Sequence, residues 1–164
     1  AYFFFFFKRK EYYQLAGFLF IGMTVALLIY TVFLFCIAFR PDLTSLGRKN
    51  ILIDLTGFIY ANDGPINCCP SIHCFNSIGV CIGINKCASL RSKKAVRAGS
   101  VILSTLICLS TVFVKQHSVK DVIGAFLLAG VMYLAVYVIP NRIAAKKRGD
   151  AKVAAHAAGQ AFRV

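Results

Sequence analysis

The sequence predicts an all-α protein, a polytopic bundle of transmembrane helices. Of its 164 residues, 59% are hydrophobic and only 15% are charged, which is not the composition of a soluble domain of this size. Four uncharged segments are long enough, or nearly so, to cross a hydrocarbon core of about 30 Å. They are residues 14–39, 66–85, 98–114 and 122–139. A soluble helical core would need a polar exterior, which these segments do not supply.

The chain opens with an apolar stretch, residues 1–7, which a basic triplet at residues 8–10 follows. A secretory signal has its positive charges before the apolar segment, and here they come after it. We therefore expect residues 1–7 to be the end of an earlier membrane span. The chain would then hold four full spans, of which residues 14–39 form the first.

The longest polar segment follows this first span. Apolar residues recur at roughly helical spacing between positions 50 and 60, which predicts a helix along the membrane interface. The tetrapeptide Asn-Asp-Gly-Pro at 62–65 is a strong turn signal that ends this helix.

The second full span, residues 66–85, contains Pro70 near its start. Proline suits the first turn of a helix, because its missing N–H would have no partner there. Ser71 and His73 are therefore predicted at a helix N-terminus. Free N–H groups and the positive end of the helix dipole favour an anion at such a place.

The third and fourth spans enclose a short segment that carries His117 and Asp121. If this segment is helical, the two side chains share one face, so that the carboxylate orients the imidazole and stabilises its charged form. The alternative is a solvated pair of Asp121 with Lys120, which would contribute about 0–1 kcal/mol. An acidic residue at the start of an apolar span is costly unless it has a use. The spacing therefore predicts an activated histidine.

The positive charges predict the orientation. Alternate loops carry 3, 5 and 6 Lys or Arg residues on one side of the membrane, against 3 and 2 on the other. Because these residues concentrate on the cytoplasmic side, His73 and His117 are both predicted to face the extracytoplasmic side. The net charge of +13 is explained by this topology and by anionic headgroups, so we expect no nucleic-acid partner.

Three motifs together resemble those of the phosphatidic acid phosphatase type 2 superfamily, the integral membrane lipid phosphate phosphatases. The tetrapeptide at 70–73 resembles the Pro-Ser-x-His motif, and Arg40 with Pro41 matches the end of the first motif. Ser110, His117 and Asp121 match the spacing of the third motif, Ser-Arg, five residues, His, three residues, Asp. The resemblance covers roughly residues 14–139 and implies a six-helix architecture. It places a phosphatase-like transmembrane domain at 1–140 and a basic cytoplasmic tail at 141–164.

The resemblance implies hydrolysis of a lipid phosphate monoester or diphosphate at the outer leaflet of the cell membrane. His117 would attack phosphorus to give a phosphohistidine, and Asp121 would stabilise the imidazolium. His73 would protonate the leaving alkoxide and then help to activate water. Ser71, Arg40 and the amides at the helix start would hold the phosphoryl oxygens.

Two cationic positions of the family are absent here. Phe33 stands where the first motif has Lys, and Thr111 stands where the third has Arg. Lys115 follows Thr111 by four residues, so on a helix it would lie on the same face, one turn nearer the outer surface. We therefore predict Lys115 as a further phosphate-binding residue, with less geometric control than an arginine would give.

No metal or other cofactor is implied, and the sequence has no acidic cluster to hold one. The expected partners are a lipid phosphate substrate and membrane lipids. Two alternatives stay open. A lipid phosphotransferase of the sphingomyelin or inositol phosphorylceramide synthase type would pass the phosphoryl group to an alcohol. A catalytically weak membrane lipid-binding protein is favoured by the missing Lys and Arg.

Overall fold

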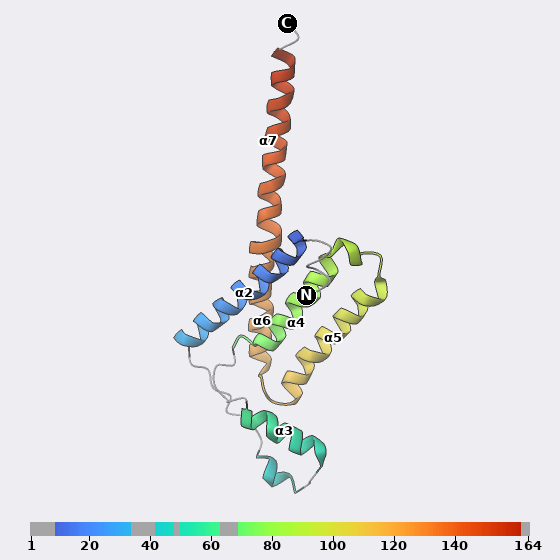
Figure 1. Cartoon of the computed structure of the whole chain (residues 1–164). Helices are drawn as coiled ribbons and strands as arrows, with labels where there is room; N and C mark the ends of the chain where they lie inside the picture. Colours follow the sequence, from blue (N-terminus) through green and yellow to red (C-terminus); the bar gives the residue numbers. More distant parts are fainter. Residues whose placement is uncertain (1–8, 34–41, 48–49, 63–68, 162–164) are drawn as a thin grey trace.

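The computed structural model describes residues 9–33, 42–47, 50–62 and 69–161, and all regular structure within these ranges is helical. The predicted all-α membrane bundle is therefore confirmed (Figure 1). The elements are α2 (Arg9–Val32), the short 3-10 helix η1 (Leu43–Leu46), α3 (Ile51–Asn62), α4 (Ile72–Lys86), η2 (Ala88–Leu90), α5 (Lys94–Phe113), α6 (Val119–Tyr133), the π-helical turn η3 (Leu134–Val138) and α7 (Ile139–Ala161).

Among the described residues, three helices are long and apolar enough to cross a membrane. They are α2, α5 and the continuous helix over Val119–Ala151. The predicted span at residues 66–85 corresponds to α4, which begins only at Ile72. Its 15 residues extend about 22 Å, which is short of a hydrocarbon core of about 30 Å. The expected end of an earlier span, residues 1–7, lies outside the described residues.

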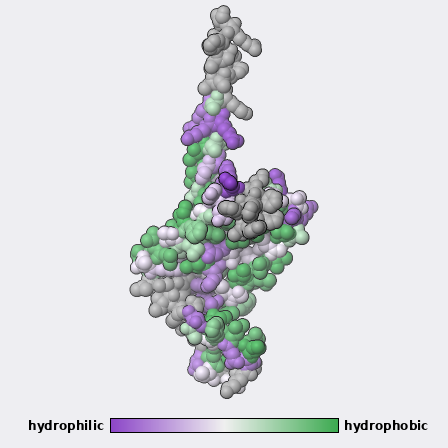
Figure 2. All heavy atoms as spheres, in the orientation of Figure 1, coloured by the Kyte–Doolittle hydropathy of each residue, from purple (hydrophilic) through white to green (hydrophobic). Residues whose placement is uncertain are grey.

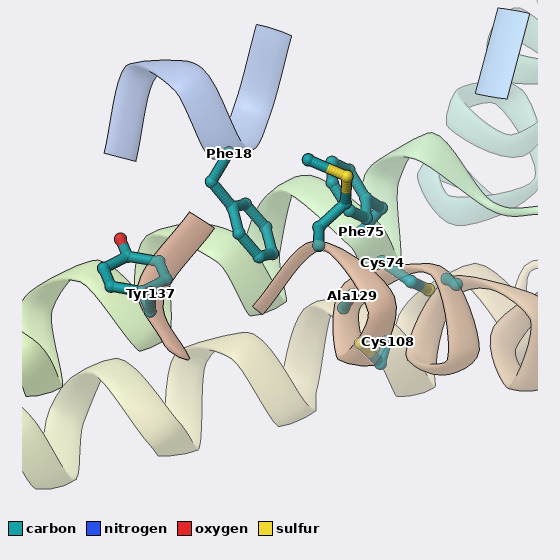
Figure 3. Close-up of a cluster of buried hydrophobic side chains, with 8 residues drawn as sticks. Phe18, Cys74, Phe75, Cys108, Ala129 and Tyr137 are labelled. Carbon is teal, nitrogen blue, oxygen red and sulfur yellow. The ribbon is translucent and has the colours of Figure 1, made fainter. Parts of the chain in front are cut away.

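The short helix α4 lies in the middle of the bundle, where it contacts α2, α5 and α6. The rings of Phe18 and Phe75 stack with centroids 5.1 Å apart in the buried cluster between these helices (Figure 3). Glycines let α2 and α4 approach. A Cβ at Gly22 would overlap the ring of Phe75, and one at Gly79 would lie 2.6 Å from Cε1 of Phe18. Small residues at such contacts are typical of membrane helix bundles.

The last helix runs from α6 through η3 into α7 without a break. Pro140 has no N–H to donate to the carbonyl of residue 136, and the wider π turn just before it accommodates that loss. The predicted domain boundary at 140/141 therefore falls inside a continuous helix. Helix α7 leaves the bundle at the end opposite α3 and carries hydrophilic side chains there (Figures 1 and 2).

A helix is present where one is predicted between positions 50 and 60; it is α3, which has no buried residue. The hydroxyl of Tyr60 donates to the carbonyl of Val114 at 2.7 Å, so α3 is attached where α5 ends. The basic loops gather at the other end of the bundle. There the amide of Ala88 donates to Oε1 of Glu11 at 3.2 Å, and Nε of Arg97 donates to Oδ1 of Asn85 at 3.0 Å.

Candidate active site

The end of α2 and the starts of α4 and α6 meet at one end of the bundle. The hydroxyl of Tyr30 in α2 donates to the carbonyl of Pro70, and the amide of Ser71 donates to the carbonyl of Asp121 at 3.1 Å. These two bonds join the first residues of α4 to both neighbouring helices. The segment that carries the Pro-Ser-x-His motif is thus held in place from two sides.

The two predicted histidines lie together at this end. The ring centroids of His73 and His117 are 5.8 Å apart, and the ring planes are inclined at 60°. His73 is exposed in the first turn of α4, whereas His117 is 9% exposed in the turn between α5 and α6. Residues more than 40 positions apart in the sequence therefore present two imidazoles to one site.

Asp121 lies behind His117. The Nδ1 atom of His117 is 3.7 Å from Oδ2 of Asp121, and the same Oδ2 accepts a hydrogen bond of 2.7 Å from the amide of Ser118. Ser118 is the N-cap of α6 and forms a capping box with Asp121. The premise that His117 and Asp121 share a helix is wrong, because His117 precedes the cap. The pairing itself is present, and it leaves Nε2 as the ring nitrogen on the side away from the carboxylate.

A tight turn places His117 over the end of α5. The carbonyl of Thr111 accepts hydrogen bonds from the amides of Gln116 at 3.0 Å and His117 at 3.1 Å. Lys115 lies in this turn with a left-handed φ of 57°. The helical argument for Lys115 is therefore wrong, because α5 ends at Phe113 and Lys115 is an exposed residue beyond it. Its role in phosphate binding stays a prediction.

The start of α4 supplies hydrogen-bond donors. Ser71 is fully buried, and its hydroxyl accepts a 3.3 Å bond from the amide of Cys74, which makes it the N-cap. The amides of Ile72 and His73 have no partner within the helix, because the first turn of any helix leaves its donors free. These amides and the helix dipole favour an anion beside the His73 ring.

The remaining motif positions are Thr111 and Phe33, which depart from the family motifs, and Ser110 and Arg40, which match them. Thr111 is 4% exposed, and its Oγ1 lies 3.5 Å from Sγ of Cys74. Ser110 is exposed, and its hydroxyl donates to the carbonyl of Ile107 at 2.8 Å. Phe33 is 56% exposed just after the end of α2. Arg40 lies outside the described residues, so its role also stays a prediction.

Cys69 is a further residue at this site, and the motifs do not predict its role. Burial and the neighbouring Asp121 carboxylate raise the pKa of the Cys69 thiol, so the thiol stays protonated at neutral pH. Its sulfur also packs against α6, since a Cβ at Gly124 would lie 3.1 Å from it. The sequence offered only one signal for this residue, its place directly before Pro70.

A family model described as the PAP2 superfamily matches residues 39–144, which is more than half of the chain. No curated protein and no solved structure matches the chain. The matched segment contains α3 to α6 and both histidines. The chain therefore belongs to the PAP2 superfamily, which generally comprises phosphatases.

Proposed function

We propose that this protein is a membrane phosphatase that removes the phosphate group from a lipid phosphate at the extracytoplasmic side, through a phosphohistidine intermediate. One observation carries the proposal. Two imidazoles lie 5.8 Å apart, and Asp121 is 3.7 Å behind one of them. This arrangement supplies a nucleophile with its orienting carboxylate and, opposite it, a separate acid.

In the first step, Nε2 of His117 attacks phosphorus. The N–P bond forms and the bond from phosphorus to the lipid oxygen breaks, while protonated His73 gives its proton to that oxygen. The positive charge that develops on the His117 ring is stabilised by the Asp121 carboxylate. The 3.7 Å separation is typical of a pair that closes when substrate is bound.

In the second step, water attacks the phosphohistidine. His73, now neutral, takes a proton from the water as the new P–O bond forms. The P–N bond then breaks, His117 regains its free nitrogen, and inorganic phosphate leaves. His73 ends the cycle protonated, as it began.

The phosphoryl oxygens need donors during both steps. The free amides of Ile72 and His73 point to such a role, because a helix start is a ready anion site. Buried Ser71 supports it as the cap that holds the turn. We assign two cations to these oxygens: Arg40, which matches the arginine of the first motif, and Lys115, in place of the cations missing at Phe33 and Thr111.

The outward orientation rests on charge. The basic loop with Lys86, Arg91 and Arg97 lies at the bundle end away from the histidines. Because basic loops stay on the cytoplasmic side, the histidine end faces outward. The substrate is then a lipid of the outer leaflet.

The test uses purified full-length protein and a panel of lipid monophosphates and diphosphates, with no alcohol added. We expect release of inorganic phosphate, and we expect His117→Ala to abolish it, because among the described residues His117 is the one imidazole that faces His73. Product formed only when an alcohol acceptor is present would indicate the phosphotransferase instead. Undiminished turnover by His117→Ala would overturn the proposal.

A further inference from the structure

Two apolar grooves flank the helix pair α4 and α5. The larger, about 490 Å³, lies between α4, α5 and α6 and includes Ile78, Ile82 and Val101 in its lining. The smaller, about 260 Å³, is lined by α4 and α5 alone, including Asn76, Val80 and Leu103. Volume alone favours the larger groove as a site for a hydrocarbon chain.

Helical geometry favours the smaller groove. Its α4 residues Asn76, Ser77, Val80 and Ile84 follow His73 by 3, 4, 7 and 11 positions, which places them on the His73 face of the helix. Ile78 and Ile82 follow His73 by 5 and 9 positions and lie on the opposite face. The smaller groove therefore lies below His73 on the same face of α4, beginning one turn away at Asn76, and we call it the His73 groove.

Asn76 is a polar residue in the upper part of this groove. Its Oδ1 is buried without a hydrogen-bond partner, and the described residues offer no partner to its amide nitrogen either. An unpaired amide in an apolar setting is costly, and residues of this kind in membrane spans are usually functional. A hydroxyl both donates and accepts hydrogen bonds, so it pairs with either the oxygen or the nitrogen of the Asn76 amide. The χ2 torsion of asparagine has a broad range, so the amide group rotates to face such a hydroxyl.

We propose that the His73 groove holds one hydrocarbon chain of the substrate and that Asn76 binds a hydroxyl on the first carbons of that chain. This inference rests on the proposed function, in which His73 protonates the leaving lipid oxygen. Asn76 lies three residues below His73, about 4.5 Å along the helix axis. A hydroxyl two or three bonds from the ester oxygen spans that interval. The substrate class is thus a single-chain lipid phosphate with a hydroxyl near its phosphate.

The first test fills each groove in turn. Val80 and Val101 are 42% and 49% exposed and line the smaller and the larger groove respectively, so they form a matched pair. We expect Val80→Phe to lower kcat/KM for hexadecyl phosphate about tenfold or more and to spare p-nitrophenyl phosphate, which has no chain. Val101→Phe should leave both unchanged. The reverse pattern would overturn the assignment of the groove.

The second test compares hexadecyl phosphate with 2-hydroxyhexadecyl phosphate. We expect the full-length protein to prefer the hydroxylated lipid on the order of tenfold in kcat/KM. This is the effect expected when the lipid gains one hydrogen bond to the protein. Asn76→Leu should remove this preference and retain turnover of hexadecyl phosphate. A preference that persists in Asn76→Leu would overturn the role of Asn76.

A third measurement does not depend on turnover. A hexadecyl phosphate with a mid-chain diazirine should crosslink to Val80, Leu103 or their neighbours in the His73 groove. Crosslinks confined to the larger groove, or to bilayer lipid alone, would overturn the inference. If no phosphate ester is hydrolysed and the His73 groove is nevertheless crosslinked, the proposed function fails and the groove assignment stands.

Discussion

At the scale of single residues, the spacing of His117 and Asp121 predicts that the two side chains pair. The pair is present in the structure, but it does not form on a shared helix face. A separation of four residues predicts a shared helix face, whereas the carboxylate belongs to a capping box and the imidazole lies just before it. Either arrangement brings the side chains together, so spacing alone could not distinguish them. The structure adds that Asp121 both caps α6 and faces His117.

These two roles of Asp121 can be separated. Asn at position 121 keeps an oxygen that accepts from the amide of Ser118 but removes the charge that faces His117. We expect Asp121→Asn to lower kcat on the order of 10²- to 10⁴-fold with an unchanged melting temperature in detergent. Asp121→Ala should lose a similar rate and also about 1 kcal/mol of stability, as when other caps are removed. Equal melting temperatures for the two variants would contradict the capping role.

The role of His73 can be tested with leaving groups of different basicity. An alkoxide needs a proton as it departs, whereas p-nitrophenolate does not. We expect His73→Ala to lower the rate of the first step for an alkyl phosphate on the order of 10²- to 10⁴-fold and to affect p-nitrophenyl phosphate much less in a pre-steady-state burst. Equal losses for both substrates would show that His73 acts in another way.

At the scale of elements, the sequence predicted the helices better than their ends. Residues 66–85 are uncharged throughout, so the length of that run hid a helix that starts only at Ile72. Pro70 and Ser71 mark the true start, and both signals can be recognised in the sequence. The end of α5 had no such mark, because the left-handed residue is Lys115 and not a glycine or asparagine. The sequence around Lys115 therefore carries no local signal that the helix has already ended.

The contact between α2 and α4 should depend on glycine. A Cβ at Gly22 would overlap the ring of Phe75, whereas one at Gly17 in the same helix meets nothing within 4 Å. We expect Gly22→Ala to lower the free energy of unfolding by about 1–3 kcal/mol, the usual cost of overpacking. Gly17→Ala is the matched control, with no loss or a gain of about 0.5–1 kcal/mol. Thermal melting in detergent measures both, and equal melting temperatures would contradict the packing described.

At the scale of the whole molecule, two ends of the bundle differ in chemistry. The histidines, Asp121 and α3 lie at one end, and the basic loops lie at the other with the start of α7. Charge counts along the sequence predicted this division, because each apolar span reverses the direction of the chain. Counting could not predict that α4 is short and central, since that depends on packing against α2, α5 and α6.

This division can be measured as topology. Lys120 and Arg91 are both exposed, near opposite ends of the bundle. We expect a membrane-impermeant maleimide to label Lys120→Cys in intact cells above the wild-type background, and Arg91→Cys only after the cells are permeabilised. Labelling in the opposite order would place the histidines on the cytoplasmic side.

The most direct test of the central claim traps the phosphorylated protein. In His73→Ala, p-nitrophenyl phosphate should still phosphorylate His117, because its leaving group needs no acid, but water is then poorly activated and the intermediate accumulates. Rapid quenching followed by peptide mass spectrometry should therefore find an acid-labile phosphate on His117. The same phosphate should be missing when His117→Ala is added. Phosphate on another residue, or an equal amount without His117, would contradict the account.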